Sequence, residues 1–290
     1  MRVARARILS NPVVLSCAGA ALLYLGLLVL YPYGNVATFS FWSKSLYTIT
    51  PDFQFGNYAR LIENPLYATV IGNSLRIAAA VTLVSGVLGY VLAYFLARQA
   101  GQWRNLLVLL LMVPLWTSFL LRAYVWKIIL GRSGILAGIL SEFGIAPESI
   151  EFLLYSDVSV AIALTYIFIP FVALPVFVAL DKIPSSLTDA SADLGASPAR
   201  TFVHVVFPLT LPGLIAGATI VFCLSFGDFI APTLLGGSDT LMIATVIIGQ
   251  FGAAFDWPFG SALAMVVLVI VLAAVTLSGW LGLRVLGSKS

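Results

Sequence analysis

The stretch that decides the fold runs from Asp181 to Leu214, DKIPSSLTDASADLGASPARTFVHVVFPLTLPGL, and is the longest polar interruption in a hydrophobic chain. Pro184 and the serines after it predict the start of a helix, in which Ser186 and Asp189 have capping-box spacing. Gly195 is expected to end this helix. One of its faces is apolar and carries Leu187, Ala190 and Leu194.

A second helix is predicted directly after the glycine. Ser197 can cap it, with Pro198 at its first position. Pro208 is expected to end it, because proline lacks a backbone donor and crowds Phe207 before it. The sequence therefore predicts two short helices that meet at a glycine elbow. A plainer interpretation is a polar helical hairpin that only connects two membrane spans.

The composition of the whole chain indicates which class of protein contains this elbow. Hydrophobic residues make up 61% of the chain and charged residues 9%, whereas about a quarter of a typical soluble domain is charged. We therefore expect an all-α, polytopic membrane protein. The formal net charge of +3 is too small to indicate nucleic-acid binding. Cys17 and Cys223 lie in apolar runs, so we expect neither a disulfide framework nor a metal site, and no cofactor on this chain.

Hydropathy predicts about six helical spans, and we place them at residues 13–31, 69–96, 106–130, 158–180, 209–230 and 259–283. A cleaved signal is the alternative for the first one. Asn11-Pro12 leaves too short an apolar region before Cys17, and the apolar run continues past that cysteine. We expect the first span to be retained, so that residues 1–290 form a single transmembrane domain with a core at about 69–283.

The distribution of charge predicts the orientation of these spans. Segments assigned to the cytoplasm carry most of the basic residues: Arg2, Arg5, Arg7, Arg98, Arg104, Lys182, Arg200, Arg284 and Lys289. Segments assigned to the outside carry Lys44, Arg60, Arg132 and acids that include Glu142, Glu148 and Glu151, besides interfacial aromatics that include Trp42, Tyr47, Phe53, Phe55 and Tyr58. Both termini are therefore expected in the cytoplasm, as is the 181–208 loop between spans four and five.

Catalysis is not expected of this chain. It lacks a phosphate-binding Gly-x-x-x-x-Gly-Lys-Ser/Thr motif, and its only histidine, His204, has no nucleophile or acid beside it in sequence. An ion-coupled carrier usually shows inverted repeats, which are not visible here. A membrane scaffold remains compatible with the composition alone.

Asp228 is the one acid placed near a membrane core, where a carboxylate needs a partner or water. Two interpretations stand. Asp228 lines a passage for a cationic solute together with Trp116 and Arg122, two residues of the third span. Alternatively, it pairs with Arg122, Lys127 or Arg76, or it caps the end of a broken helix.

The elbow resembles the EAA loop of ABC importer permeases, which reads Glu-Ala-Ala, three residues, Gly, nine residues, then Ile-x-Leu-Pro. The matching residues are Asp189, Ala190, Ser191, Gly195, Val205, Phe207 and Pro208. Asp, Ser, Val and Phe replace the family's Glu, Ala, Ile and Leu, and the spacing agrees throughout. The resemblance implies a type I importer permease fold and a loop that docks in a groove of a separate cytoplasmic ATPase.

A narrower resemblance rests on Pro114 to Arg122, Ser225 to Gly237 and Asp256-Trp257-Pro258. These stretches are similar to the first permease subunit of spermidine/putrescine-type ABC importers. The resemblance implies a second permease subunit, two copies of an ATPase, an extracytoplasmic solute-binding protein and a polyamine as solute. It also implies a multi-pass protein of the inner membrane. Another small solute, such as an amino acid, is the alternative cargo.

Overall fold

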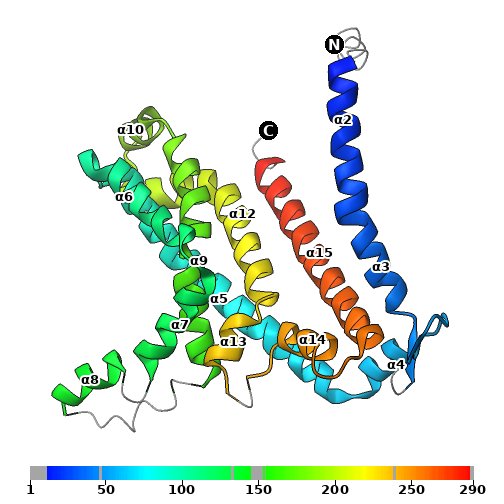
Figure 1. The fold of residues 1–290 in the computed structure, drawn as a ribbon. Helices are drawn as coiled ribbons and strands as arrows, with labels where there is room; N and C mark the ends of the chain where they lie inside the picture. Colours follow the sequence, from blue (N-terminus) through cyan, green and yellow to red (C-terminus); the bar gives the residue numbers. More distant parts are fainter. Residues whose placement is uncertain are drawn as a thin grey trace. The chain divides into compact units, whose positions relative to one another are not determined.

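The computed structural model describes residues 12–45, 48–131, 134–144, 153, 155–237 and 240–287. Some residues used in the predictions lie outside these ranges, namely Arg2, Arg5, Arg7, Tyr47, Arg132, Glu148, Glu151 and Lys289. The chain forms two compact units (Figure 1), one from residues 1–63 with 249–266 and the other from residues 64–248 with 267–290.

The described elements of the first unit precede residue 64: α2 (Pro12–Leu25), the π-helical turn η1 (Gly26–Leu30), α3 (Tyr31–Phe39), β1 (Ser43–Ser45), β2 (Thr48–Thr50) and α4 (Gly56–Glu63). The second unit holds α5 (Pro65–Arg98), η2 (Gly101–Trp103), α6 (Arg104–Met112), η3 (Val113–Trp116), α7 (Phe119–Leu130), α8 (Ile135–Glu142), α9 (Asp157–Asp181), α10 (Ser185–Asp193), α11 (Pro198–Thr201), η5 (Phe202–Val206), α12 (Phe207–Phe226) and α13 (Ile230–Leu235). Helices α14 (Ile243–Phe251) and α15 (Trp257–Gly287) carry residues of both units.

Six stretches, each made up almost wholly of described residues, are long and apolar enough to cross a membrane, as predicted: Ser16–Phe39, Pro65–Arg98, Phe119–Glu142, Asp157–Asp181, Pro198–Phe226 and Trp257–Arg284. The third of these joins α7 and α8 across residues 132–133, which lie outside the described ranges. The predicted third span, residues 106–130, is wrong as a continuous helix. A 3-10 turn covers Val113–Trp116, and Thr117 is extended, with φ −88° and ψ 153°, before α7 begins. Pro114 lies near the start of this 3-10 turn, where it supplies no backbone donor.

Two prolines do not end their helices, contrary to prediction. The first span was expected to stop at residue 31, before Pro32, and the second elbow helix at Pro208. In each case a π-helical turn precedes the proline: the Tyr31 N–H donates to the Gly26 carbonyl, and the Phe207 N–H donates to the Phe202 carbonyl. In both places the backbone N–H before the proline bonds five residues back, and the helix continues through the proline.

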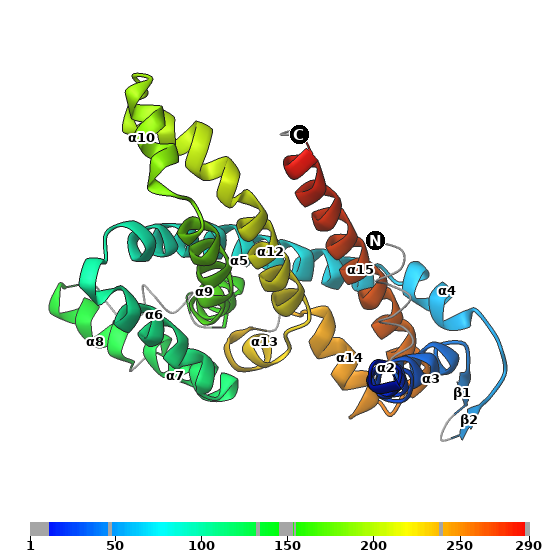
Figure 2. The same cartoon turned by 90° about the horizontal axis from the view of Figure 1, so that it is seen from above.

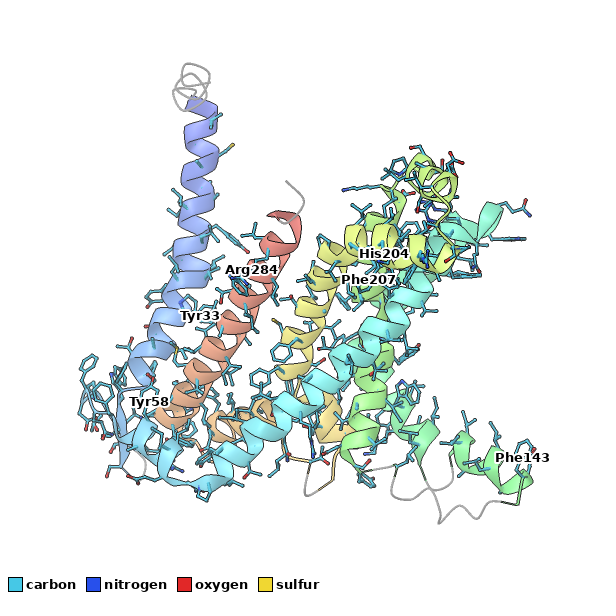
Figure 3. All side chains as sticks on the ribbon, turned by 180° about the vertical axis from the view of Figure 1, so that it is seen from behind. Tyr33, Tyr58, Phe143, His204, Phe207 and Arg284 are labelled. Carbon is cyan, nitrogen blue, oxygen red and sulfur yellow. The ribbon has the colours of Figure 1, made fainter. Side chains whose placement is uncertain are left out.

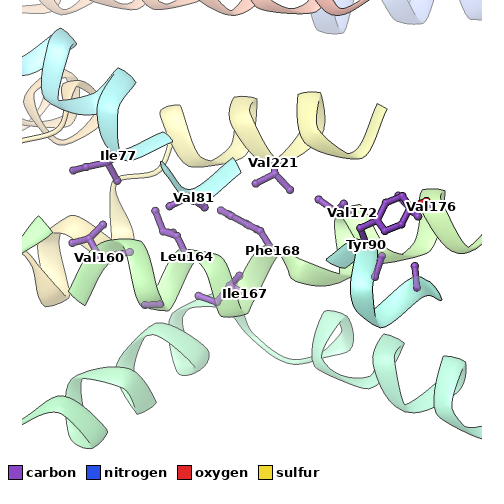
Figure 4. Close-up of a cluster of buried hydrophobic side chains, with 14 of the residues drawn as sticks. Ile77, Val81, Tyr90, Val160, Leu164, Ile167, Phe168, Val172, Val176 and Val221 are labelled. Atoms are coloured by element: carbon purple, nitrogen blue, oxygen red, sulfur yellow. The ribbon is translucent and has the colours of Figure 1, made fainter. Parts of the chain in front are cut away.

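The core of the second unit is built around α9. Figure 2 looks nearly along this helix and shows α5, α7, α12 and α13 around it, all of which contact it. Its buried face carries Leu164, Phe168 and Val172, which pack with Val81 of α5 and Val221 of α12 (Figure 4). Burial of such side chains holds the three long helices α5, α9 and α12 together.

Glycines allow these helices to approach closely. A Cβ on Gly89 of α5 would lie 2.9 Å from Val172 Cβ, and one on Gly217 of α12 would lie 2.8 Å from Val172 Cα. A Cβ on Gly213 would lie 2.7 Å from the carbonyl oxygen of Pro175. Small residues at such positions are typical of membrane helix interfaces, where packing rather than water drives association.

The first unit contains a short hairpin that the all-α prediction omitted. Strands β1 and β2 pair antiparallel, with Ser43 opposite Thr50. The Asp52 carboxylate accepts from the Ser43 backbone N–H at 2.9 Å and from the Ser43 hydroxyl at 2.8 Å. Hydrogen bonds between polar groups hold these strands in place. The strands have no alternating apolar pattern, so hydropathy does not reveal them.

Candidate functional site: the elbow and the outer polar residues

The first elbow helix, α10, ends at Gly195 as predicted. Gly195 has φ +78°, its N–H donates to the Ala192 carbonyl at 2.8 Å, and the Ala196 N–H donates to the Ser191 carbonyl at 3.1 Å. These two bonds form a Schellman end, which requires a left-handed residue. The predicted capping box is wrong: the residue that precedes α10 is Pro184, two positions before Ser186, and α10 has no side-chain cap bond.

The second half of the elbow is attached to the first by side chains. Ser197 caps α11 by accepting from the Arg200 N–H at 3.4 Å. The Ser191 hydroxyl lies 2.9 Å from the hydroxyl of Thr201, a buried residue on the other arm. The sequence singled out Ser191 but not Thr201, because no local pattern shows which hydroxyls meet across a turn. The elbow is therefore a braced unit.

Aromatic side chains fix the base of the elbow to the membrane helices. Phe207 packs against Tyr90 of α5 and Phe202 of η5, with ring centroids 5.7 Å and 6.1 Å away. The Tyr90 hydroxyl lies 2.8 Å from that of Thr210 on α12, in a buried position. Phe207 stands where the family motif has leucine, and its ring connects the elbow to both helices. His204 lies beside it on an exposed turn (Figure 3).

The tip of the elbow exposes apolar side chains. Leu194, next to Gly195, is 89% exposed, and Val203 and Leu187 are 55% and 43% exposed. Of the motif residues, Asp189, Ala190 and Gly195 are exposed, whereas Ser191, Val205, Phe207 and Pro208 are partly buried. The face predicted from Leu187, Ala190 and Leu194 is thus not covered by this chain. An uncovered apolar face on a polar loop is typical of a protein-docking surface.

Arg98 lies behind the elbow and was predicted only as a cytoplasmic charge. Its guanidinium donates to the carbonyls of Leu180 and Ile183, at 3.4 Å and 3.5 Å, where α9 ends. A cation at a helix C-terminus stabilises the carbonyls that lack helical partners. Arg98 also lines a cavity of about 350 Å³ between α5 and the elbow, with Thr188 on the opposite wall. If the elbow moved, the movement would therefore be transmitted to both α5 and α9.

Asp228 caps a helix. Its side chain is held by the backbone: Oδ2 accepts from the Ala231 N–H at 2.8 Å, in the first turn of α13. The residue is 8% exposed. Among the described residues no ion pair joins Asp228 to Arg76, Arg122 or Lys127: Arg76 pairs with Asp157, Arg122 donates to the Ile167 carbonyl at 3.4 Å, and Lys127 Nζ lies 6.0 Å from the Tyr155 ring centroid.

The two other candidates for the translocation path lie on either side of the break in the third span. Trp116 belongs to the 3-10 turn and is 71% exposed. Arg122 is on α7, with its guanidinium 5.8 Å from the Phe119 ring centroid and its Nε buried without a partner among the described residues. No contact described here joins either of them to Asp228. Their shared role therefore stays a prediction.

Comparison with known proteins identifies the family. Residues 85–285 match the family described as binding-protein-dependent transport system inner membrane component. The chain belongs to this family. The permease is 40% identical over 237 residues to the spermidine/putrescine transport system permease protein PotB of Escherichia coli (strain K12), across 82% of this chain and 85% of PotB.

One further relative and one solved structure are also similar to the permease. It is 33% identical over 261 residues to the inner membrane ABC transporter permease protein YdcU of Escherichia coli (strain K12), across 86% of this chain and 82% of YdcU. A crystal structure of a bacterial ABC transporter involved in the import of alginate matches it with a TM-score of 0.76, at 15% identity and across 98% and 99% of the two chains. That structural likeness shows the fold alone. The predicted ABC importer permease fold is confirmed.

Proposed function

We propose that this permease carries a polyamine-class cation, such as spermidine or putrescine, across the inner membrane in an ATP-driven importer. It forms half of the solute path beside a second permease subunit. ATP is hydrolysed by a separate ATPase dimer, and an extracytoplasmic binding protein delivers the solute. Both termini and the 181–208 elbow face the cytoplasm.

The observation that carries the solute class is the 40% identity to PotB over 82% of this chain. The aligned region covers 82% of this chain and 85% of PotB. The 33% identity to YdcU, whose name gives no solute, supports an ABC transporter permease but does not indicate which solute it carries. Another small solute therefore remains the second candidate.

Three features of the elbow support its coupling to the ATPase. The exposed Leu194 offers an apolar contact at the tip. The Ser191–Thr201 hydroxyl pair braces the two arms. Phe207 and Arg98 attach the base to α5, α9 and α12. A braced elbow of this kind would transmit the closure of an ATPase dimer to the spans, as alternating access requires.

The test is stimulation of ATP hydrolysis in the complex reconstituted in liposomes with its partner subunits and binding protein. We expect spermidine or putrescine, but not an amino acid or a simple sugar, to stimulate hydrolysis and to be taken up. Stimulation by another solute alone would overturn the polyamine assignment and leave the importer intact. Failure of any ATPase to copurify with the permease would contradict the role of the elbow.

Asp228 provides a second test, because its cap and its charge can be separated. Asparagine can still accept from the Ala231 N–H, so Asp228→Asn is expected to preserve α13 and the yield of assembled complex. Loss of the negative charge is expected to lower uptake of the cationic solute several-fold. Asp228→Ala, which removes the cap as well, is the matched variant. Equal loss of assembled complex in both variants would assign Asp228 a purely structural role.

A further inference from the structure

A large cavity of the second unit lies between α5, α7 and α9. Its volume of about 750 Å³ is within the roughly 300–1,000 Å³ of small-molecule sites. Aliphatic side chains such as Ile77, Val84 and Ile162 form most of its wall. None of the residues predicted for the translocation path lines it. The sequence could not show it, because its lining comes from three helices far apart in the chain.

Polar and aromatic groups stand at defined places in this apolar wall. Asp157, in the first turn of α9, forms an ion pair with Arg76 of α5. The two side chains are 31% and 66% exposed, so both are reachable from the cavity opening. Further along α9, Tyr166 makes an edge-on pair with Trp126 of α7, with ring centroids 5.6 Å apart. Asp157 lies at the end of α9 opposite the elbow.

We propose that this cavity receives the solute, with Asp157 binding one ammonium group and the Trp126–Tyr166 pair a second one. The inference rests on the proposed function and adds the site that binds the cation. An arriving ammonium group displaces the Arg76 guanidinium from the Asp157 carboxylate. While the cavity is empty, the Arg76 guanidinium stays paired with the Asp157 carboxylate.

The chemistry of the cavity favours a linear polyammonium ion over other solutes. A carboxylate and aromatic faces attract ammonium groups, and the aliphatic wall suits the methylene chains between them. A sugar would need many hydrogen-bonding partners, and burying its hydroxyls against Ile77 and Val84 would be unfavourable. An amino acid would place its carboxylate on Arg76 and its ammonium group on Asp157, but would leave the Trp126–Tyr166 pair without an ammonium group.

Photo-crosslinking tests the site directly. A diazirine-bearing spermidine analogue is delivered by the loaded binding protein to the reconstituted complex, and labelled peptides are identified by mass spectrometry. We expect label on α5, α7 or α9 residues that line the cavity, and competition by unlabelled spermidine. Label confined to the Asp228 region would overturn the proposal, as would labelling of this cavity by a photoactivatable phospholipid that spermidine does not displace.

Uptake by variants separates binding from structure. Asp157→Asn and Trp126→Ala are each expected to lower spermidine uptake about 10-fold at saturating loaded binding protein, with normal yield of the complex. Arg76→Gln is expected to retain or raise uptake, because it frees the carboxylate. If Arg76→Gln and Asp157→Asn lose uptake equally, and the charge-swapped Arg76→Asp/Asp157→Arg double variant restores it, the ion pair is structural and the proposal is wrong.

A control distinguishes failure of this site from failure of the solute assignment. Asp256→Asn also removes the acid of an ion pair, with Arg60 at 2.8 Å, and neither residue lines the cavity. Its spermidine uptake is expected to match that of the unmodified complex. If the unmodified complex takes up no polyamine, the proposed function fails. If it does, and Asp157→Asn takes up polyamine equally well, only the site fails.

Discussion

Replacing Gly195 with valine is expected to lower ATP-driven solute uptake about 10-fold while the complex still assembles. Gly195 has φ +78°, a region that costs an L-residue about 1–2 kcal/mol and a β-branched residue more. The substitution therefore opposes the turn whose bonds join Ala192 to Gly195 and Ser191 to Ala196. Loss of that turn would separate Ser191 from Thr201 and leave the elbow unbraced. Uptake and ATP hydrolysis are measured together in proteoliposomes.

Two matched variants show whether the effect belongs to the elbow. Gly195→Asn is expected to retain most of the uptake, since asparagine adopts the left-handed conformation more readily than valine. Gly101, between α5 and α6, has φ +50° and no heavy atom within 4 Å of an added Cβ. Gly101→Val thus imposes comparable backbone strain outside the elbow. Equal loss of uptake in Gly101→Val and Gly195→Val would mean general destabilisation and would contradict the coupling role.

Replacing Gly217 with valine is expected to have the largest effect on folding. An added Cβ would lie 2.8 Å from Val172 Cα and 2.9 Å from the Phe171 carbonyl oxygen. Both are backbone atoms, which a rotamer change cannot move away. Overpacking of this kind costs about 1–3 kcal/mol, and it would separate α12 from α9 along the core shown in Figure 4. We expect less folded permease and a Tm lower by roughly 5 °C.

The measurement is the yield of monodisperse permease and its thermal unfolding in one detergent. Gly72→Val is the control, because Gly72 is also inside a long helix, α5, and an added Cβ there meets nothing within 4 Å. It is expected to unfold at the temperature of the unmodified protein. Similar loss in both variants would show that β-branching in the helix, rather than the close approach to α9, is responsible.

Local chemistry predicted the first arm of the elbow well. A Schellman end depends on a residue that tolerates positive φ, and Gly195 follows α10 at the required place. Local chemistry failed at Pro208 and Pro32. A π-helical turn precedes each of these two prolines, and the helix continues through it. The sequence gives no local signal for that wider turn.

The sequence by itself determined that the chain is helical, spans a membrane about six times and carries a glycine elbow, because hydropathy, length and turn chemistry are properties of neighbouring residues. Only the tertiary structure decided that Ser191 meets Thr201, that Asp228 caps α13, and that Asp157, Arg76 and Trp126 line one cavity. Ser191 and Thr201 lie on different arms of the elbow, and the cavity residues come from three helices, whereas Asp228 had several partners within reach and only its geometry shows which one it bonds. Which of these groups meet depends on how each helix is rotated about its axis. These helices have apolar residues on every side, so glycine contacts and packing volume decide that rotation, and sequence periodicity does not.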